Sequence, residues 1–196
     1  MRKAEINRKT NETDIKLLLD LDGTGASDIK SGSGFLDHML ELFAKHGSFD
    51  LTVNCAGDTK VDMHHSVEDI GISLGQGFKT ALGDKKGITR YGCMCLPMDE
   101  ALLQVAVDIS GRSLLRFDVK FPDEYKVGDL DTELIEEFLL GFVRNAEITL
   151  HVAKMSGSNI HHIVEAIFKA LGRVLRQAVS IDIRNKGVLP STKGVL

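Results

Sequence analysis

Apolar and polar residues alternate along residues 14–23, and a period of two is typical of a β-strand with one buried face. Nearly the same pattern returns at residues 100–111. Each predicted strand runs into a glycine-containing turn, and Glu12 and Glu100 precede those turns by the same number of positions. The chain therefore repeats itself with an offset of 88 residues.

The later elements follow the same repeat once an insertion around residues 120–130 is allowed. A helical spacing of apolar residues, then a strand and then a second helix are predicted in each half, at 35–43, 49–54 and 62–82 and again at 134–142, 147–153 and 159–178. Lys86-Gly87-Ile88 is echoed by Lys186-Gly187-Val188. The order strand, strand, helix, strand, helix thus occurs twice.

We therefore predict an α/β (α+β) fold built from an internally duplicated β-β-α-β-α unit, in which the sheets of two similar halves pack against helices. Such an arrangement resembles the ribosomal protein S5 domain 2-like fold. One domain, residues 1–196, would contain both repeats, at about 1–90 and 91–196.

Composition excludes several classes of protein. The formal net charge of -4 argues against a general nucleic-acid binder, which needs a basic face. The longest apolar runs, such as residues 138–143, are too short to span a membrane, and the first residues lack the apolar core of a signal peptide. Cys55, Cys93 and Cys95 fit no zinc or disulfide spacing, so we expect buried thiols in a cytoplasmic protein.

The motif His-His-x-x-Glu occurs at residues 64–68 and again at residues 161–165, at corresponding places in the two halves. A single histidine is usually a surface or core residue, but six of the seven histidines lie in or near these motifs and their partner elements. On a helix the motif glutamate shares a face with each histidine, whereas adjacent histidines diverge by about 100°. The two histidines of one motif are therefore expected to bind different metal ions.

The helix that precedes each motif offers one more ligand, His38 in the first half and Glu137 in the second. The eight candidate ligands, four for each of two ions, are His38, His64, His65, Glu68, Glu137, His161, His162 and Glu165. Imidazole and carboxylate ligands together suit Zn²⁺, Fe²⁺ or Mn²⁺, and spacing does not choose between them. Four ligands on an octahedral ion leave two positions for a substrate.

Four separated motifs carry a family resemblance that spans the chain from Arg8 to Gly194. They are Leu-Asp-His-Met-Leu, Asp-x-His-His-x-x-Glu-Asp, Asn-x-His-His-x-x-Glu-Ala-x-Phe-Lys-Ala and Pro-Ser-Thr-Lys-Gly. In this order they resemble the imidazoleglycerol-phosphate dehydratase family. The resemblance implies a homo-oligomer of 24 subunits and two Mn²⁺ ions per active site, with ligands from neighbouring subunits. Many members have histidine where this chain has Glu137, a carboxylate that can also bind Mn²⁺.

The resemblance also implies a reaction, the removal of water from imidazole-glycerol phosphate to give imidazole-acetol phosphate in histidine biosynthesis. The carbon that loses its proton has no adjacent carbonyl, so the substrate's imidazole must delocalise the charge. Two metal ions that hold the ring as an imidazolate would allow the C3 hydroxyl to leave. The resulting diazafulvene-like intermediate has an acidic C2 proton.

Proton transfer and phosphate binding require further residues. The repeat nominates Glu12 and Glu100 as acid/base groups, and the family motif Arg-x-Thr-x-Glu-Thr at residues 8–13 favours Glu12 over its counterpart. His46 is an alternative proton shuttle. Family positions assign the substrate phosphate to a set of cationic and hydroxyl side chains, Arg90, Arg112, Lys169, Ser191 and Lys193.

Two other kinds of protein also use paired metal ions. A dinuclear hydrolase activates water against phosphate esters, but such sites are usually rich in aspartate, and imidazoles dominate here. A non-catalytic metal-storage or metal-assembled protein would use the motifs only to join subunits. That alternative leaves Arg90, Arg112 and Lys193 without a role.

Overall fold

The structure is a computed structural model that describes residues 2–122 and 125–196. The first half contains β1 (Lys3–Lys9), β2 (Thr13–Asp20), β3 (Ser27–Lys30), α1 (Gly34–Gly47), β4 (Asp50–Gly57) and α2 (His64–Leu82). The second half contains β5 (Tyr91–Met98), β6 (Ala101–Asp108), β7 (Leu114–Asp118), β8 (Lys126–Val127), β9 (Leu130–Asp131), α3 (Leu134–Ala146), β10 (Thr149–Ser156) and α4 (Ile160–Val179). A short 3-10 helix, Ile183–Asn185, follows α4.

The two halves have the same topology, which confirms the predicted duplicated α/β fold. The first sheet has the strand order β1-β2-β4-β3 and the second has β5-β6-β10-β7. In each sheet the last strand runs parallel to its neighbour, and the other pairs are antiparallel.

The first half contains one strand more than the predicted unit, β3, and the second half contains three more, β7 and the two-residue strands β8 and β9. The reason is visible in β3, which has only four residues. Ile29 is buried there, while its neighbours Asp28 and Lys30 face solvent. So short a strand carries no readable alternation of apolar and polar residues.

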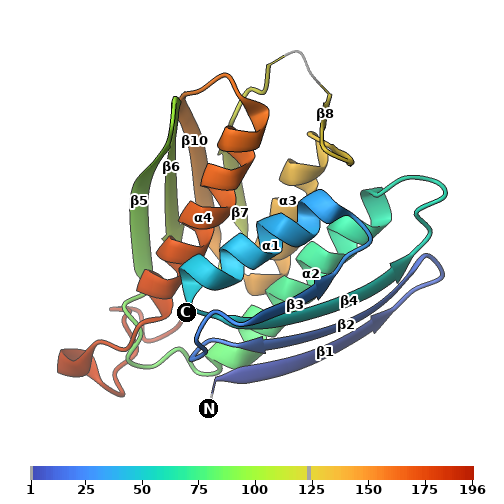
Figure 1. Cartoon of the computed structure of the whole chain (residues 1–196). Coiled ribbons are helices and arrows are strands. Elements are labelled where there is room, and N and C mark those ends of the chain that lie inside the picture. The colour runs from blue at the N-terminus through green and yellow to red at the C-terminus, as the bar shows by residue number, and fades with distance from the viewer. Residues whose placement is uncertain (1, 123–124) are drawn as a thin grey trace.

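Four long helices lie between the two sheets (Figure 1). The inner face of each sheet is apolar, as at Ile15, Leu17 and Leu19 of β2, which are at most 2% exposed. Against these faces, α2 covers β1 and β2, and α4 covers β5 and β6. Hydrophobic residues of both halves form one continuous buried cluster.

Each helix pair takes one helix from either half, because α1 packs against α4 and α2 against α3. Glycines allow these pairs to approach to backbone contact. A Cβ atom on Gly172 of α4 would lie 2.5 Å from the Phe43 carbonyl oxygen of α1, and one on Gly75 of α2 would lie 2.4 Å from that of Phe142 in α3. The two crossings occupy corresponding positions in the repeat.

The expectation that all three cysteines are buried is wrong for Cys93 and Cys95, which are exposed; Cys55 is half-buried. The alternation along β5 is as predicted, but the cysteines occupy its outer face. The inner face is taken by Gly92, whose Cβ position would lie 2.1 Å from the Val174 carbonyl oxygen of α4. Within the two described stretches, no helix is long and apolar enough to cross a membrane.

Replacing Gly172 with alanine should destabilise the fold. The new methyl group would force α1 and α4 apart, so we expect the free energy of unfolding to fall by about 2 kcal/mol. Urea unfolding at fixed chain concentration measures the change. The matched control is Gly34→Ala in α1, where nothing lies within 4 Å of the added Cβ and stability should be maintained. Equal stability of the two variants would contradict the role assigned to this crossing.

Candidate active site

The N-terminus of α1, which carries His38, is held by residues of both halves. The Ser33 side chain caps the helix by accepting a hydrogen bond from the Leu36 N–H. Asp129, from the turn between β8 and β9, accepts hydrogen bonds from Ser33 Oγ, at 2.8 Å, and from the Gly34 N–H, at 2.9 Å. A negative charge at a helix N-terminus is favourable. The insertion in the second half thus fixes a helix of the first.

Three of the proposed metal ligands converge where α1 meets α4. One ligand atom each from His38, His161 and Glu165 lies within 4.8 Å of the other two. His161 Nε2 lies 3.0 Å from Glu165 Oε2. Two imidazoles and a carboxylate on one face fit a first-row divalent cation, and three protein ligands leave positions for further donors. This group can therefore hold a metal ion, with His38 supplied by one half and the other two ligands by the second.

Glu165 is buried between Lys169 and His161 of its own helix, α4. Burial alone would raise the pKa of its carboxyl, but Lys169 and His161 lower that pKa overall. Lys169 Nζ forms an ion pair with Glu165 and lies 3.6 Å from Met98 Sδ. His46, at the end of α1, has a pKa lowered by burial and by the charges of Lys169 and Arg173. Both Lys169 and His46 therefore lie on the metal side of the molecule.

The repeat-related ligands His64, Glu68 and Glu137 are all half-buried, on α2 and α3. These helices are in contact next to the ligands, because a Cβ on Gly141, one turn after Glu137, would lie 2.8 Å from the Glu68 carbonyl oxygen. In the described part of the chain these three side chains do not form a group as close as the first. Their helices, α2 and α3, nevertheless make the same glycine-mediated backbone contact as α1 and α4.

The second histidine of each motif forms a hydrogen bond with a carboxylate that is not among the proposed metal ligands. His65 donates from Nδ1 to Asp58 Oδ2 at 3.0 Å, which raises the pKa of the imidazole. His162 donates from Nδ1 to Glu100 Oε2 at 2.7 Å, with the same effect on its pKa. The bond from His162, together with the Asn159 and Ser158 N–H groups, lowers the pKa of Glu100 to about 2.

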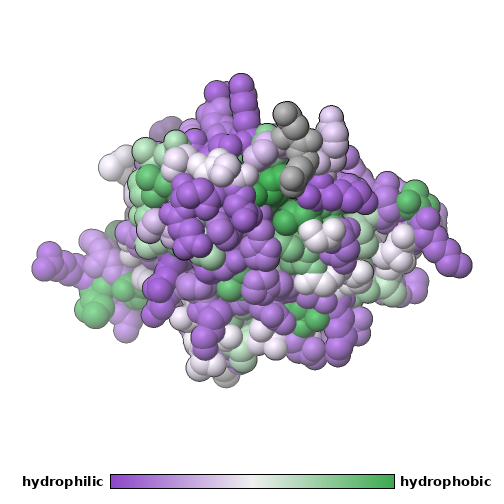
Figure 2. Space-filling model, turned by 45° about the horizontal axis from the view of Figure 1, so that its top comes forward, coloured by the Kyte–Doolittle hydropathy of each residue, from purple (hydrophilic) through white to green (hydrophobic). Residues whose placement is uncertain are grey.

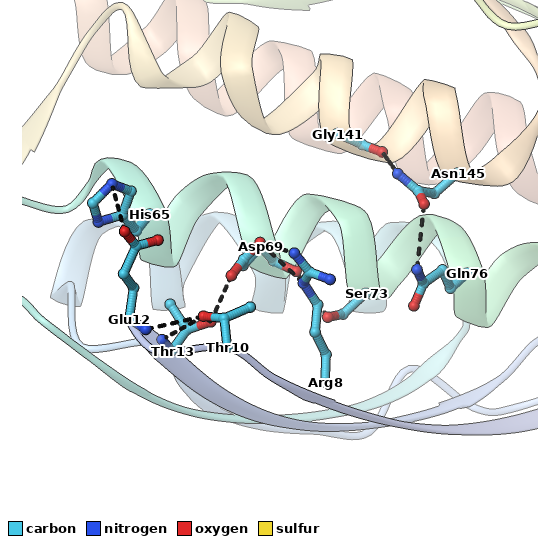
Figure 3. A network of polar contacts seen from close by, with 10 residues as sticks. All are labelled: Arg8, Thr10, Glu12, Thr13, His65, Asp69, Ser73, Gln76, Gly141 and Asn145. Carbon is cyan, nitrogen blue, oxygen red and sulfur yellow. Dashed lines mark hydrogen bonds and ion pairs between the residues drawn. The ribbon is translucent and has the colours of Figure 1, made fainter.

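Glu12 lies 3.8 Å from the opposite ring nitrogen, Nε2, of His65 (Figure 3). Its side chain is 51% exposed, and within the described residues its carboxylate accepts no hydrogen bond at ordinary distance. The two repeat-related glutamates therefore differ, since Glu100 is fully engaged and Glu12 is free.

A buried polar network holds the turn that carries Glu12 (Figure 3). Asp69 of α2 accepts hydrogen bonds from Arg8 at 3.0 and 2.7 Å and from Thr13 Oγ1 at 2.5 Å. The Thr10 hydroxyl accepts from the N–H groups of Glu12, at 3.1 Å, and Thr13, at 2.9 Å. The helix that supplies His64 and His65 thus also positions this turn.

A second group of the predicted residues gathers at the start of β5. Arg90 donates to Asp108 Oδ1 at 2.7 Å and to the Pro190 carbonyl at 2.8 Å, so it ties the C-terminal tail to the sheet. Its φ of 75° is uncommon for a residue with a side chain. Arg112, 66% exposed, also lies near Asp108. Ser191 lines the same groove, and Lys193 donates its N–H to Ser191 Oγ.

The two groups lie at opposite ends of the β5–β6 hairpin. Met98 pairs with Ala101 at the end near the metal ligands, and Tyr91 pairs with Asp108 at the other. Because a strand rises about 3.3 Å per residue, the two ends of β5 are roughly 23 Å apart. In Figure 1 the start of α4 lies at the top and the chain after α4 at the lower left. Figure 2, with the top turned forward, shows mostly hydrophilic side chains separated by smaller apolar areas.

Comparison with known proteins decides the family. Residues 31–175 match the family model described as imidazoleglycerol-phosphate dehydratase. The chain belongs to this family. A relative of that name from Oceanobacillus iheyensis is 57% identical over the full length of both chains, and one from Bacillus velezensis is 59% identical, also over both full lengths. The family resemblance predicted from the motifs is thereby confirmed, as is the prediction that the chain is an enzyme.

Solved structures of the dehydratase family have the same fold. The crystal structure from Staphylococcus aureus has a TM-score of 0.83 and 42% identity, and the match covers 92% of this chain and 99% of that one. The structure from Pyrococcus furiosus has a TM-score of 0.83 and 38% identity, over 97% of this chain and 100% of that one.

Sequence reasoning did not identify four aspartates that position the dehydratase site. They are Asp58, Asp69, Asp108 and Asp129, and each bonds to a group far from it along the chain or on a neighbouring element. Asp69 directly follows Glu68 in the motif Asp-x-His-His-x-x-Glu-Asp, so the sequence alone could have identified it. Asp108 corresponds to Asp20 in the repeated strand, but the repeat does not indicate its partner Arg90, and Asp58 and Asp129 stand in no repeated pattern.

Replacing Asp69 with alanine should both destabilise the fold and release the Glu12 turn. Removal of one partner of a buried charge pair typically costs about 3 kcal/mol, and Asp69 is only 6% exposed. The control is Asp14→Ala on the same hairpin, since Asp14 forms an exposed ion pair with Lys9 that contributes at most about 1 kcal/mol. Urea midpoints at equal chain concentration compare the variants. A loss from Asp14→Ala as large as that from Asp69→Ala would refute the assignment.

Proposed function

We propose that the chain removes water from imidazole-glycerol phosphate to form imidazole-acetol phosphate in histidine biosynthesis. The proposal is carried by the convergence of His38, His161 and Glu165 at the contact between α1 and α4. The family relationship supports it, and so does the free carboxylate of Glu12 beside the second motif histidine of the first half.

Two Mn²⁺ ions per active site are the proposed cofactors. The donor set of imidazoles and carboxylates fits such an ion, and the family is metal-dependent. His38, His161 and Glu165 would hold one ion, and the corresponding His64, Glu68 and Glu137 would contribute to the other. His65 and His162 would complete the sites with the ring nitrogens that face away from Asp58 and Glu100. When bound, the ions act as Lewis acids on the substrate's imidazole ring.

The chain's own residues would bind the substrate and move its protons. Glu12 is the proposed acid/base group, because its carboxylate is exposed and its turn is fixed by Asp69. Lys169 and His46, both on the metal side, could contact the substrate near its reacting carbons. Arg112, with its exposed guanidinium, and Ser191 and Lys193 of the tail would bind the phosphate. Arg90 would contribute by anchoring that tail.

A single chain does not bring these groups together around one small substrate. The metal ligands and the Arg90 group lie at opposite ends of a hairpin roughly 23 Å long, whereas a three-carbon phosphate chain on an imidazole is less than half that length. We therefore propose that neighbouring subunits share each active site. The family resemblance implies 24 chains for this homo-oligomer, and we propose that it works in the cytoplasm.

Incubation with imidazole-glycerol phosphate and Mn²⁺ tests the activity. We expect formation of the ultraviolet-absorbing enol of imidazole-acetol phosphate without release of inorganic phosphate. Release of phosphate would favour the dinuclear hydrolase instead. Glu12→Gln should keep metal and assembly but lower kcat at least about 100-fold, the usual contribution of a positioned acid/base group. Normal turnover in that variant would remove Glu12 from the mechanism and favour a different proton carrier.

Removal of metal should dissociate the assembly, because a neighbouring subunit is proposed to complete the ligand set that His38, His161 and Glu165 of one chain begin. Sedimentation velocity before and after chelation measures this. We expect small species after chelation and recovery of the large one when Mn²⁺ is restored. As a control, the chelator is added together with excess Mn²⁺, which should leave the profile unchanged. An intact assembly without metal would argue against shared metal sites.

A further inference from the structure

The second histidines of the two motifs are repeat-related, but the carboxylates that hold them are not. Glu100 stands before β6, at the position that Glu12 occupies before β2. Asp58 instead follows β4. Nevertheless both carboxylates accept a hydrogen bond from the Nδ1 atom of a second histidine, at 3.0 Å for His65 and 2.7 Å for His162.

Glu100 binds the backbone at the start of α4 as well as the side chain of His162. Its Oε1 accepts hydrogen bonds from the N–H groups of Ser158, at 3.1 Å, and Asn159, at 2.8 Å. Asn159 is the N-cap residue of α4, and its side chain accepts from the His162 N–H. Both oxygens of the Glu100 carboxylate therefore accept hydrogen bonds from the start of α4.

A carboxylate only accepts hydrogen bonds, so Nδ1 of each second histidine carries the proton. In the neutral imidazole that metal binding requires, the lone pair then resides on Nε2, the atom that points away from Asp58 or Glu100. In the first half this nitrogen faces Glu12 at 3.8 Å, and in the second it faces Asp99 at 3.7 Å.

We infer that Asp58 and Glu100 are matching positioning residues, each of which orients the second histidine of its motif for metal binding through Nε2. This inference rests on the proposed function for the identity of the ion. The acid/base role of the repeat position thus falls to Glu12 alone. Its counterpart Glu100 has taken over the orienting task that Asp58 performs in the first half.

Mn²⁺ affinity tests the assignment, measured without substrate by competition with a metal-sensitive dye at constant pH. Loss of an orienting partner typically weakens metal binding about 10- to 100-fold, which we expect for one class of site in Glu100→Gln and in Asp58→Asn. With saturating Mn²⁺, both variants should recover most of their kcat. Glu12→Gln should leave the affinity unchanged. Unchanged affinity in Glu100→Gln would overturn the inference, and an accompanying loss of kcat would make Glu100 a second acid/base group.

Asp99→Asn is the matched control, because Asp99 is 74% exposed and faces His162 without a bond to Nδ1. Its affinity should stay within about threefold of the parent, since an exposed pair contributes little. A double-mutant cycle excludes general damage to the fold. In a His162→Asn background, Glu100→Gln should weaken Mn²⁺ binding no further, and a further tenfold loss would overturn the inference. Because binding is measured without substrate, failure of the dehydration assay is distinguishable from failure of this assignment.

Discussion

Backbone contact between helices of different halves determines where the chemical groups of this molecule meet. Gly172 lets α4 touch α1, and Gly75 lets α2 touch α3, so the helices approach to backbone contact at both glycines. The contact between α1 and α4 places His38 within reach of His161 and Glu165. A wider spacing of these helices would separate the ligands. The metal site is thus a consequence of helix packing as much as of ligand type.

The duplicated halves have diverged in their polar networks while keeping their topology. In the first half Asp69 anchors the hairpin that carries Glu12, and the corresponding residue of the second half is an alanine, Ala166. There Glu100 itself binds the N-terminal turn of α4. One half therefore leaves its glutamate free, and the other uses it for structure. Asymmetry of this kind allows a repeated fold to present two different chemical environments.

The sequence predicted the repeat, the helices and most strands because alternation and helical spacing are local properties of the chain. It also nominated the candidate metal ligands, six of which lie in the two contiguous His-His-x-x-Glu motifs, and the structure brings His38, His161 and Glu165 together. The cross-half pairing of helices, the role of Asp129 as a cap for α1 and the engagement of Glu100 were not predictable in this way. Each depends on contacts between residues far apart along the chain. The outward direction of Cys93 and Cys95 was misjudged because alternation defines two faces without saying which one is covered.

The metal ligands and the tail cations lie at opposite ends of the β5–β6 hairpin, so a defect in one chain would affect the active sites of its neighbours. In the proposed assembly the group His38, His161 and Glu165 of a chain serves one reaction centre and the cations of its tail serve another. A faulty tail would then impair a neighbour's centre, while the faulty chain's imidazoles could still serve a sound one. In a mixed population of intact and defective chains, loss of function would be distributed among partners instead of staying with the defective copy.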